Sequence, residues 1–259
     1  MTPNPLKKAL HAGQFTLGSW VSLCSPIGAE VMGLAGFDWL LIDMEHGPGD
    51  YQTLLHQLQA MGCAGSTTPV VRVQNNDPNI IKRVLDLGAG GVMVPGVRSV
   101  EEARQAVAAL RYPPGGIRGI AGVRAGRFGL DRDYVHQAND NICLFLQIEN
   151  RDAVEQAEEI LAIPGIDVAF IGPNDLAADL GHTGQLSHPD VLAAIEAVEK
   201  AAQKNKVAIG TISGNWEQCR TLIERGYRAM SIMSDVSMLM RLAQEATTSF
   251  RAHPMVKDA

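Results

Sequence analysis

The chain has 259 residues and a formal net charge of −6, with 46% hydrophobic and 19% charged residues. This length is close to the roughly 250 residues of one (β/α)₈ barrel and allows one large core. No apolar run approaches the roughly 18 residues of a membrane span, and the absence of a basic cluster, together with an aromatic content of only 5%, argues against a nucleic-acid surface.

The N-terminal segment predicts a cytoplasmic protein. Lys7 and Lys8 stand near the start, but no apolar stretch of signal-peptide length follows them. The cysteines form no C-x-x-C pair, so neither a zinc knuckle nor a redox motif is indicated. The four cysteines are Cys24, Cys63, Cys143 and Cys219.

Short apolar runs alternate with helical patterns along the chain. The predicted strands are 16–23, 37–42, 69–73, 91–94, 142–148, 166–171, 207–211 and 228–232. The predicted helices are 27–35, 51–60, 78–87, 100–110, 152–161, 189–204, 216–225 and 235–250. Continuous apolar strands between amphipathic helices describe a parallel sheet that is covered on its outside. The pattern therefore predicts an α/β fold, with a single (β/α)₈ TIM barrel over residues 1–259.

One segment, 111–141, interrupts this rhythm and is predicted to be a loop insertion. It is rich in glycine and proline and contains Arg118, Arg124 and Arg127. Such a long connection between strands is unusual in a compact domain, and insertions in barrels often cover the active site. A basic anion-binding loop and a solvated or subunit-contacting segment both remain open. Neither G-x-G-x-x-G after a strand nor G-x-x-x-x-G-K-[ST] occurs, so nucleotide binding lacks a motif.

Two acids follow predicted strands in the second half of the chain. Glu149 follows strand 142–148, and Asp175 follows strand 166–171. A carboxylate at the end of a buried strand needs water, a partner or a metal ion. Two carboxylates without His or Cys nearby in the sequence favour Mg²⁺ or Mn²⁺, with Zn²⁺ as an alternative. Taken alone, Asp175 is better explained as the cap of a short helix.

Further polar residues follow the second and third predicted strands. Asp43 and His46 are three positions apart in a tight loop with Glu45 between them, and Arg72 lies on the third strand. A carboxylate this close could orient the imidazole and favour its charged form, which makes a general base. The alternative is a surface loop in which both residues merely cap the turn. Catalytic groups in barrels come from the carboxyl ends of strands, so convergence with Arg72 favours a functional His46.

Several separated motifs resemble the HpcH/HpaI aldolase family. They are FDWLLIDMEHGP at 37–48, PVVRV at 69–73 before NDP at 76–78, RYPPGGIRG at 111–119, QIE at 147–149 and FIGPNDLA at 170–177. They stand in the family's order and cover nearly the whole chain. The resemblance implies a barrel of the phosphoenolpyruvate/pyruvate type. It also implies a class II pyruvate aldolase that reversibly cleaves 4-hydroxy-2-oxo acids to pyruvate and an aldehyde with Mg²⁺, Mn²⁺ or Co²⁺.

The same resemblance implies roles for individual residues. Glu149 and Asp175 match metal ligands, and Arg72 matches the arginine that contacts the keto oxygen. His46 and Asp43 match the base dyad, and Glu45 would lie in the second layer of residues around the site. The implied substrate-binding residues are Arg72, Gln147, Gly172, Pro173, Asn174 and Asp175. Backbone N–H groups around residues 172–175 would hold the pyruvate carboxylate at a helix start.

Two further implications concern assembly. Asp86 matches a residue that in the family reaches a neighbouring subunit's site, and it is counted here among the catalytic residues. Family members assemble as hexamers with terminal helices packed across subunits, so a homo-oligomer is expected. The expected partners are a small 2-oxo acid and an aldehyde, with no nucleic acid and no membrane.

The residue chemistry fits such a cleavage. Breaking the bond between C3 and C4 leaves an enolate, which a divalent metal and Arg72 would stabilise. His46, directly or through a water, would take the C4 hydroxyl proton. A Schiff-base lysine is disfavoured, because Lys82, Lys200 and Lys204 fall on predicted helices and Lys206 precedes a strand.

Two alternatives to an aldolase stay open. One is another metal-dependent, enolate-forming carbon–carbon lyase, and the other is an inactive barrel that acts as a binding protein. The retention of Arg72, Glu149, Asp175 and His46 argues against the inactive barrel, since a scaffold has no need for buried charges. The segments 123–127, 210–215 and 231–235 differ from the family's usual versions, which leaves the natural aldehyde open.

Overall fold

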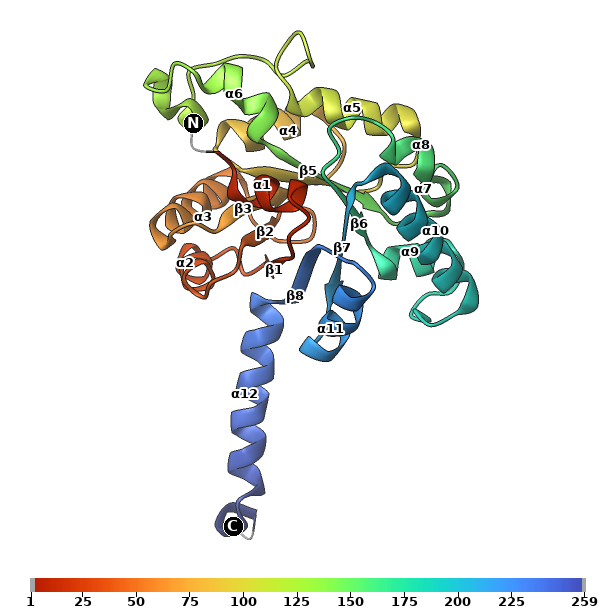
Figure 1. Cartoon of the computed structure of the whole chain (residues 1–259). Coiled ribbons are helices and arrows are strands. Elements are labelled where there is room, and N and C mark those ends of the chain that lie inside the picture. The colour runs from red at the N-terminus through yellow and green to blue at the C-terminus, as the bar shows by residue number, and fades with distance from the viewer. Residues whose placement is uncertain (1–2, 258–259) are drawn as a thin grey trace.

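Eight parallel strands close into a barrel in the computed structural model, which describes residues 3–257 (Figure 1). The strands are β1 (Thr16–Val21), β2 (Trp39–Asp43), β3 (Thr68–Arg72), β4 (Gly91–Val94), β5 (Cys143–Ile148), β6 (Val168–Ile171), β7 (Ala208–Ser213) and β8 (Ala229–Ser234). Each strand pairs with the next, and β8 pairs with β1. The predicted TIM barrel is confirmed, and residues 1–2 and 258–259 of the predicted domain lie outside the described residues.

The chain has helices around the outside of this barrel, one at its amino end and, at the C-terminus, helices that extend away from it (Figure 1). They are α1 (Pro5–His11), α2 (Pro26–Leu34), α3 (Tyr51–Ala64), α4 (Pro78–Asp86), α5 (Val100–Leu110), η1 (Arg124–Gly129), α6 (Tyr134–Asn141), α7 (Arg151–Glu155), α8 (Ala157–Leu161), α9 (Pro173–Asp179), α10 (Pro189–Asn205), α11 (Trp216–Glu224), α12 (Asp235–Ala252) and α13 (Pro254–Lys257). Within residues 3–257, none of them combines the length and the apolar character that crossing a membrane requires.

Side-chain caps fix where several predicted helices begin. Ser25, Asp50 and Asp77 each accept a backbone N–H from the first turn of α2, α3 and α4. Such a cap satisfies one of the N–H groups that a helix start leaves without a partner. Because these polar residues directly precede apolar periodic segments, the helix starts could be located from the sequence.

Large aromatic side chains fill the interior of the barrel. Trp39 contacts both Phe145 and Phe170, with ring centroids 5.2 Å and 6.4 Å apart. Gly18 on β1 makes room for them, because a Cβ atom there would lie 2.3 Å from the Trp39 ring. Gly210 on β7 does the same, since its Cβ would lie 2.9 Å from Phe170. Packing of the aromatic rings inside the barrel therefore requires glycine at these two positions.

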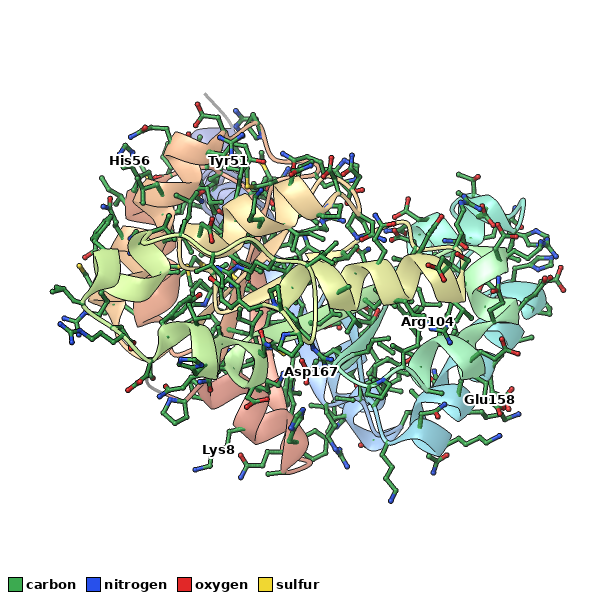
Figure 2. All side chains as sticks on the ribbon, turned by 90° about the horizontal axis from the view of Figure 1, so that it is seen from above. Lys8, Tyr51, His56, Arg104, Glu158 and Asp167 are labelled. Carbon is green, nitrogen blue, oxygen red and sulfur yellow. The ribbon has the colours of Figure 1, made fainter. Side chains whose placement is uncertain are left out.

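The short helix α1 closes the amino end of the barrel. Leu6 and Leu10 are buried in the same cluster as the interior aromatic residues. Asp167, labelled in Figure 2, lies 3.2 Å from the Lys7 ammonium and 2.7 Å from the His11 Nε2 atom. Its carboxylate also accepts the backbone N–H of Leu144. The amino end is thus sealed by apolar contacts and one shared carboxylate.

The observed helices depart from the predicted ones in several places. Helices α1, α6 and α13 and the 3₁₀ helix η1 were not predicted, and the predicted helix 152–161 is divided into α7 and α8. A short helix was considered only as one that Asp175 caps. Gly172 occupies the N-cap of α9, and Asp175 lies inside the first turn. The interpretation of Asp175 as a helix cap is therefore wrong, because Pro173 starts the helix two positions earlier.

The segment 111–141 lies against the C-terminal end of α4. It contains η1 and α6. The Arg118 guanidinium is 2.8 Å from the Asp86 carboxylate, and Arg124 donates to the Leu87 carbonyl. Helices run back from the carboxyl ends of the strands, so these contacts are at the amino end of the barrel. Within one chain this segment does not cover the carboxyl ends of the strands.

Candidate active site

Four of the predicted site residues come from the carboxyl ends of four strands. Asp43 ends β2 and Arg72 ends β3, and the two are partners in the strand register. Glu149 directly follows β5, and Asp175 lies in the first turn of α9, just after β6. Asp86, in contrast, ends α4 and pairs with Arg118 at the other end of the barrel. The strand ends therefore assemble the first four residues, while Asp86 stands apart from them in this chain.

Asp43 and Arg72 form a buried two-point ion pair. The carboxylate accepts Nε of Arg72 at 3.0 Å and Nη2 at 2.6 Å, and the exposed fractions are 3% for Asp43 and 6% for Arg72. Burial raises the pKa of Asp43, but the hydrogen bonds and the charge of Arg72, with the N–H groups of His46 and Glu45, outweigh it and leave the pKa below its ordinary value. Asp43 is thus a fixed anion that orients Arg72.

Glu45 uses the third nitrogen of the same guanidinium. Arg72 Nη1 lies 2.9 Å from Glu45 Oε2. Burial raises the pKa of Glu45, opposed by the charges of Arg72 and His46 and supported by those of Asp43 and Asp175. The negative neighbours and the burial prevail, so Glu45 holds its proton to higher pH than an exposed glutamate.

His46 lies on the exposed rim of the site. Its backbone N–H donates to Asp43 Oδ1 at 3.2 Å. In the part of the chain that the structure describes, Asp43 contacts the backbone of His46 and is shared with Arg72, with no hydrogen bond to the imidazole. The predicted dyad is therefore brought together in position, and the role of the imidazole as a base stays a prediction.

Among the described residues, no cationic side chain is bonded to the carboxylate of Glu149. Its exposed fraction is 9%, Oε1 accepts the Gly96 N–H at 2.7 Å, and Oε2 accepts the Gln147 amide. The pKa of Glu149 is raised to about 7, chiefly by burial. The charges of Asp175 and Glu45 also raise it, while the Gly96 N–H and the charge of Arg72 lower it. The Glu149 carboxylate lies against the backbone of Gly172, because a Cβ atom on Gly172 would lie 2.6 Å from Glu149 Oε2.

The turn from β6 into α9 leaves polar groups free for a ligand. The Gly172 N–H donates to the Ile148 carbonyl, and Pro173 has no N–H to give. In the first turn of α9, Asn174 and Asp175 keep N–H groups without a helical acceptor. Among the described residues, the buried Oε1 atom of Gln147 also has no hydrogen-bond partner. Two N–H donors and one acceptor thus remain for bound molecules.

The donor set fits a divalent cation of the Mg²⁺, Mn²⁺ or Co²⁺ kind. The charges of the Asp175 and Glu45 carboxylates raise the pKa of Glu149. A cation held between Glu149 and Asp175 would reverse that repulsion. Carboxylate oxygens with open positions for water and substrate suit these metals. Among the described residues, the lysines lie on helices or precede a strand, so none is placed at a strand end to form a Schiff base.

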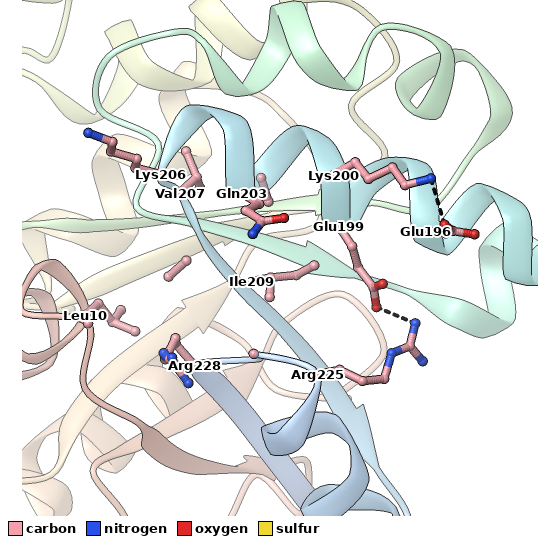
Figure 3. Close-up of a pocket in the computed structure, with 14 residues that line it drawn as sticks. Leu10, Glu196, Glu199, Lys200, Gln203, Lys206, Val207, Ile209, Arg225 and Arg228 are labelled. Carbon is pink, nitrogen blue, oxygen red and sulfur yellow. Dashed lines mark ion pairs between the residues drawn. The ribbon is translucent and has the colours of Figure 1, made fainter.

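Two hollows differ in position and in charge. One of about 330 Å³ adjoins the site and is lined by residues that include Glu45, Asn76 and Gly96. A larger hollow of about 510 Å³ lies where α10 leads into β7 (Figure 3). Two ion pairs, Arg225–Glu199 and Lys200–Glu196, line it. The larger hollow is thus at the amino end, away from the converging strand ends.

Comparison with known proteins agrees with this geometry. The family model described as HpcH/HpaI aldolase/citrate lyase matches residues 16–241. The chain belongs to this family. The HpcH/HpaI resemblance seen in the motifs is therefore confirmed, and the match includes every strand of the barrel.

Individual relatives cover almost the full length. A 4-hydroxy-2-oxo-heptane-1,7-dioate aldolase of Klebsiella pneumoniae subsp. pneumoniae is 46% identical over 250 residues, covering 95% of this chain and 94% of its own. A 2-dehydro-3,6-dideoxy-6-sulfogluconate aldolase of Pseudomonas putida is 44% identical over 236 residues, covering 91% and 92%. The crystal structure of a family protein from Burkholderia cenocepacia J2315 has a TM-score of 0.94 at 41% identity, covering 96% and 100%.

Two contacts of the site were missed in the sequence. Gly96 donates its N–H to Glu149, and the ring of Trp20 lies 5.4 Å from the Arg72 guanidinium carbon. Gly96 follows β4 within a Pro-Gly pair and has a φ of +65°, so its place at a strand end was the available signal. For Trp20, a strand residue among apolar neighbours, the sequence carried no signal.

Proposed function

We propose that this chain is a divalent-metal-dependent aldolase. It reversibly cleaves 4-hydroxy-2-oxo acids to pyruvate and an aldehyde by way of an enolate. One observation carries the proposal: the carboxyl end of the barrel joins a guanidinium fixed by two acids to a second pair of acids, Glu149 and Asp175. Relatives that are 44% and 46% identical bear the names of aldolases.

Glu149 and Asp175 would hold the cation. When bound, it supplies Lewis-acid stabilisation of the charge that develops as the bond between C3 and C4 breaks. Arg72 places a second positive charge at the keto oxygen, and its direction is set by Asp43 and Glu45. Because both partners of Arg72 are in place before substrate arrives, little reorganisation is needed when the charge appears.

The turn before α9 would bind the carboxylate of pyruvate. The N–H groups of Asn174 and Asp175 are free of helical acceptors, and the Gln147 amide lies beside Glu149. Gly172 keeps the approach open, since any side chain there would meet Glu149. These groups position the 2-oxo acid and leave its C4 end toward the rim.

His46 would remove the proton from the C4 hydroxyl. It stands at the exposed rim, beside Glu45, and acts on the part of the substrate farthest from the α9 turn. In the reverse direction, the protonated imidazole returns this proton to the new alkoxide. An exposed base suits a reaction whose second product, the aldehyde, must leave and enter through the same opening.

We also propose a homo-oligomer, a hexamer by the family resemblance. Figure 1 shows α12 extending away from the barrel. Its exposed apolar side chains include Leu239, Met240, Leu242 and Phe250. A helix with this much uncovered apolar surface favours packing against another subunit. Asp86 would then reach a neighbouring site, and the cytoplasm stays the predicted location.

The proposal is tested by metal removal. The purified protein is stripped with a chelator, and pyruvate release is followed from a panel of 4-hydroxy-2-oxo acids, with and without Mg²⁺, Mn²⁺ or Co²⁺. We expect release that depends on added metal, and its rates will rank both the metals and the acceptor aldehydes. No release from any acid with metal bound would instead favour another enolate-forming lyase.

A further inference from the structure

A second group of metal-ligating side chains lies outside the active site. His182 comes from the connection between α9 and α10, and His188 and Asp190 stand at the start of α10. Each offers one ligand atom, and these atoms lie within 4.8 Å of one another. Among the described residues, this is the group in which at least three His, Cys, Asp or Glu side chains come so close.

The three side chains converge on one carboxylate oxygen. His182 Nε2 lies 2.9 Å from Asp190 Oδ2, and His188 Nδ1 lies 3.7 Å from the same atom. The two imidazole rings are stacked, with centroids 3.5 Å apart and an interplanar angle of 17°. His188 Nδ1 also accepts the backbone N–H of Asp190 at 3.2 Å and so caps α10. Two imidazole nitrogens and one carboxylate oxygen therefore lie close together.

We propose that His182, His188 and Asp190 form a second metal site, which takes a Zn²⁺-type transition-metal ion and is separate from the carboxylates of the active site. Two histidines and one carboxylate form a donor set that zinc proteins use, with water in the fourth position. Imidazole suits Zn²⁺, Ni²⁺ and Cu²⁺, whereas Mg²⁺ prefers oxygen ligands alone. The two sites of this chain thus differ in the metal that each selects.

The charges at this site support a cation. The start of α10 is the positive end of a helix of 17 residues, which alone would repel a metal ion. Asp190 lies in that first turn, and its carboxylate offsets the positive helix end.

Metal binding requires the two imidazole rings to turn. The nitrogen lone pairs lie in the ring planes, so nearly parallel rings must tilt before both can point at one ion. Both histidines are partly exposed and Asp190 is exposed, so their side chains turn without disturbing the core. His188 would exchange its cap hydrogen bond for the metal, or turn its other nitrogen inward. A bound ion would tie the α9–α10 connection to the start of α10.

The test compares Zn²⁺ binding by tag-free full-length protein and a double variant, His182→Ala with His188→Ser. Serine keeps an oxygen that can cap α10, so the helix start is preserved. Calorimetric titration is expected to find one fewer bound Zn²⁺ per chain in the double variant. The single change His182→Ala is expected to weaken that class of binding by about tenfold or more, since even the outer partners of metal ligands contribute this much.

A matched control removes an imidazole elsewhere. His56, an exposed residue of α3 labelled in Figure 2, pairs with Gln52, and His56→Ala is expected to bind as many Zn²⁺ ions as the unchanged protein. With Cu²⁺ in place of Zn²⁺, electron paramagnetic resonance should show coupling to two nitrogens, which the double variant loses.

Equal Zn²⁺ stoichiometry and affinity in the double variant and the unchanged protein would overturn the proposal. Because the readout is a difference between variants, it holds whether or not the active site binds metal or cleaves any oxo acid. A double variant that has lost its Zn²⁺ site should also keep its thermal transition in metal-free buffer, and Zn²⁺ should shift that transition upward by less than it shifts that of the unchanged protein.

Discussion

Asp43 and Glu149 are both buried carboxylates at the carboxyl end of the barrel, yet their surroundings differ. Asp43 is bonded twice by Arg72, and its pKa lies below the ordinary value. Glu149 accepts hydrogen bonds from Gly96 and Gln147, has other acids for neighbours, and has a pKa raised to about 7. The β2–β3 side of the site is balanced by the Arg72 guanidinium, and the β5–β6 side is where we propose that a metal ion binds.

On the β5–β6 side, the largest loss of activity is expected for Glu149→Gln, which keeps the shape of the side chain and removes its charge. We expect metal-dependent pyruvate release to fall by about a thousandfold or more, since Lewis-acid stabilisation is worth several kcal/mol. The steady-state rate at saturating Mn²⁺ measures it. The matched control is Glu155→Gln, a carboxylate on the exposed end of α7. Unchanged release in Glu149→Gln would remove this residue from the metal site.

On the β2–β3 side, Arg72→Ala removes the ion pair and leaves the Asp43 carboxylate buried without its partner. We expect a loss of about 3–5 kcal/mol in the free energy of unfolding, because an uncompensated charge remains. Denaturant titration measures this loss, and adding Asp43→Asn should recover part of it. Both aldol cleavage and proton exchange at the pyruvate methyl should fall, since the enolate is common to them. Retained exchange would contradict the role at the keto oxygen.

The rim is tested by His46→Ala. We expect cleavage to slow by about a hundredfold or more, the usual contribution of a positioned base, with a smaller effect on methyl proton exchange. Following both reactions in one variant, by pyruvate release and by deuterium incorporation, separates the C4 step from enolate formation. An equal loss in both reactions would give His46 a wider role.

The smallest effect is the pH dependence of metal binding. Metal must displace the proton of Glu149, so affinity should fall by about tenfold per pH unit below about pH 7 and level off above it. In the metal-free protein this raised pKa makes the folded state bind more protons than the unfolded one. The contribution of Glu149 to stability therefore falls as pH rises from the ordinary pKa of 4.5 to about 7. Affinity independent of pH would contradict the unpaired state of Glu149.

The eight strands could be predicted because each is a short, largely apolar run between helical patterns. The missed helices lack this signal. Helix α1 buries only Leu6 and Leu10 within seven residues, and α6 buries only Tyr134 and Ala138 within eight. Short helices like these are held by tertiary contacts, which a local pattern does not record. The fold could thus be predicted from the sequence wherever the chain has an amphipathic element of ordinary length.

The site was predictable in position but not in pairing. Asp43 and Arg72 end adjacent strands, so their meeting follows from the barrel. The Asp43 carboxylate pairs with Arg72 rather than with the His46 imidazole. This choice depends on distances between strands. The Asp86–Arg118 ion pair joins α4 to the segment 111–141, and no sequence spacing indicates such a contact. Side-chain partners separated this widely in the chain are set by packing.

The tryptophans give this protein an optical reporter of its own active site. Trp20 stands 5.4 Å from the Arg72 guanidinium, while Trp39 is sealed in the bore and Trp216 is 62% exposed on α11. Any ligand that draws on Arg72 changes the electric field at the Trp20 ring, whereas the other two rings keep their surroundings. A change in intrinsic fluorescence on adding metal and pyruvate, absent in Trp20→Phe, would therefore follow occupancy of the site without a coupled assay.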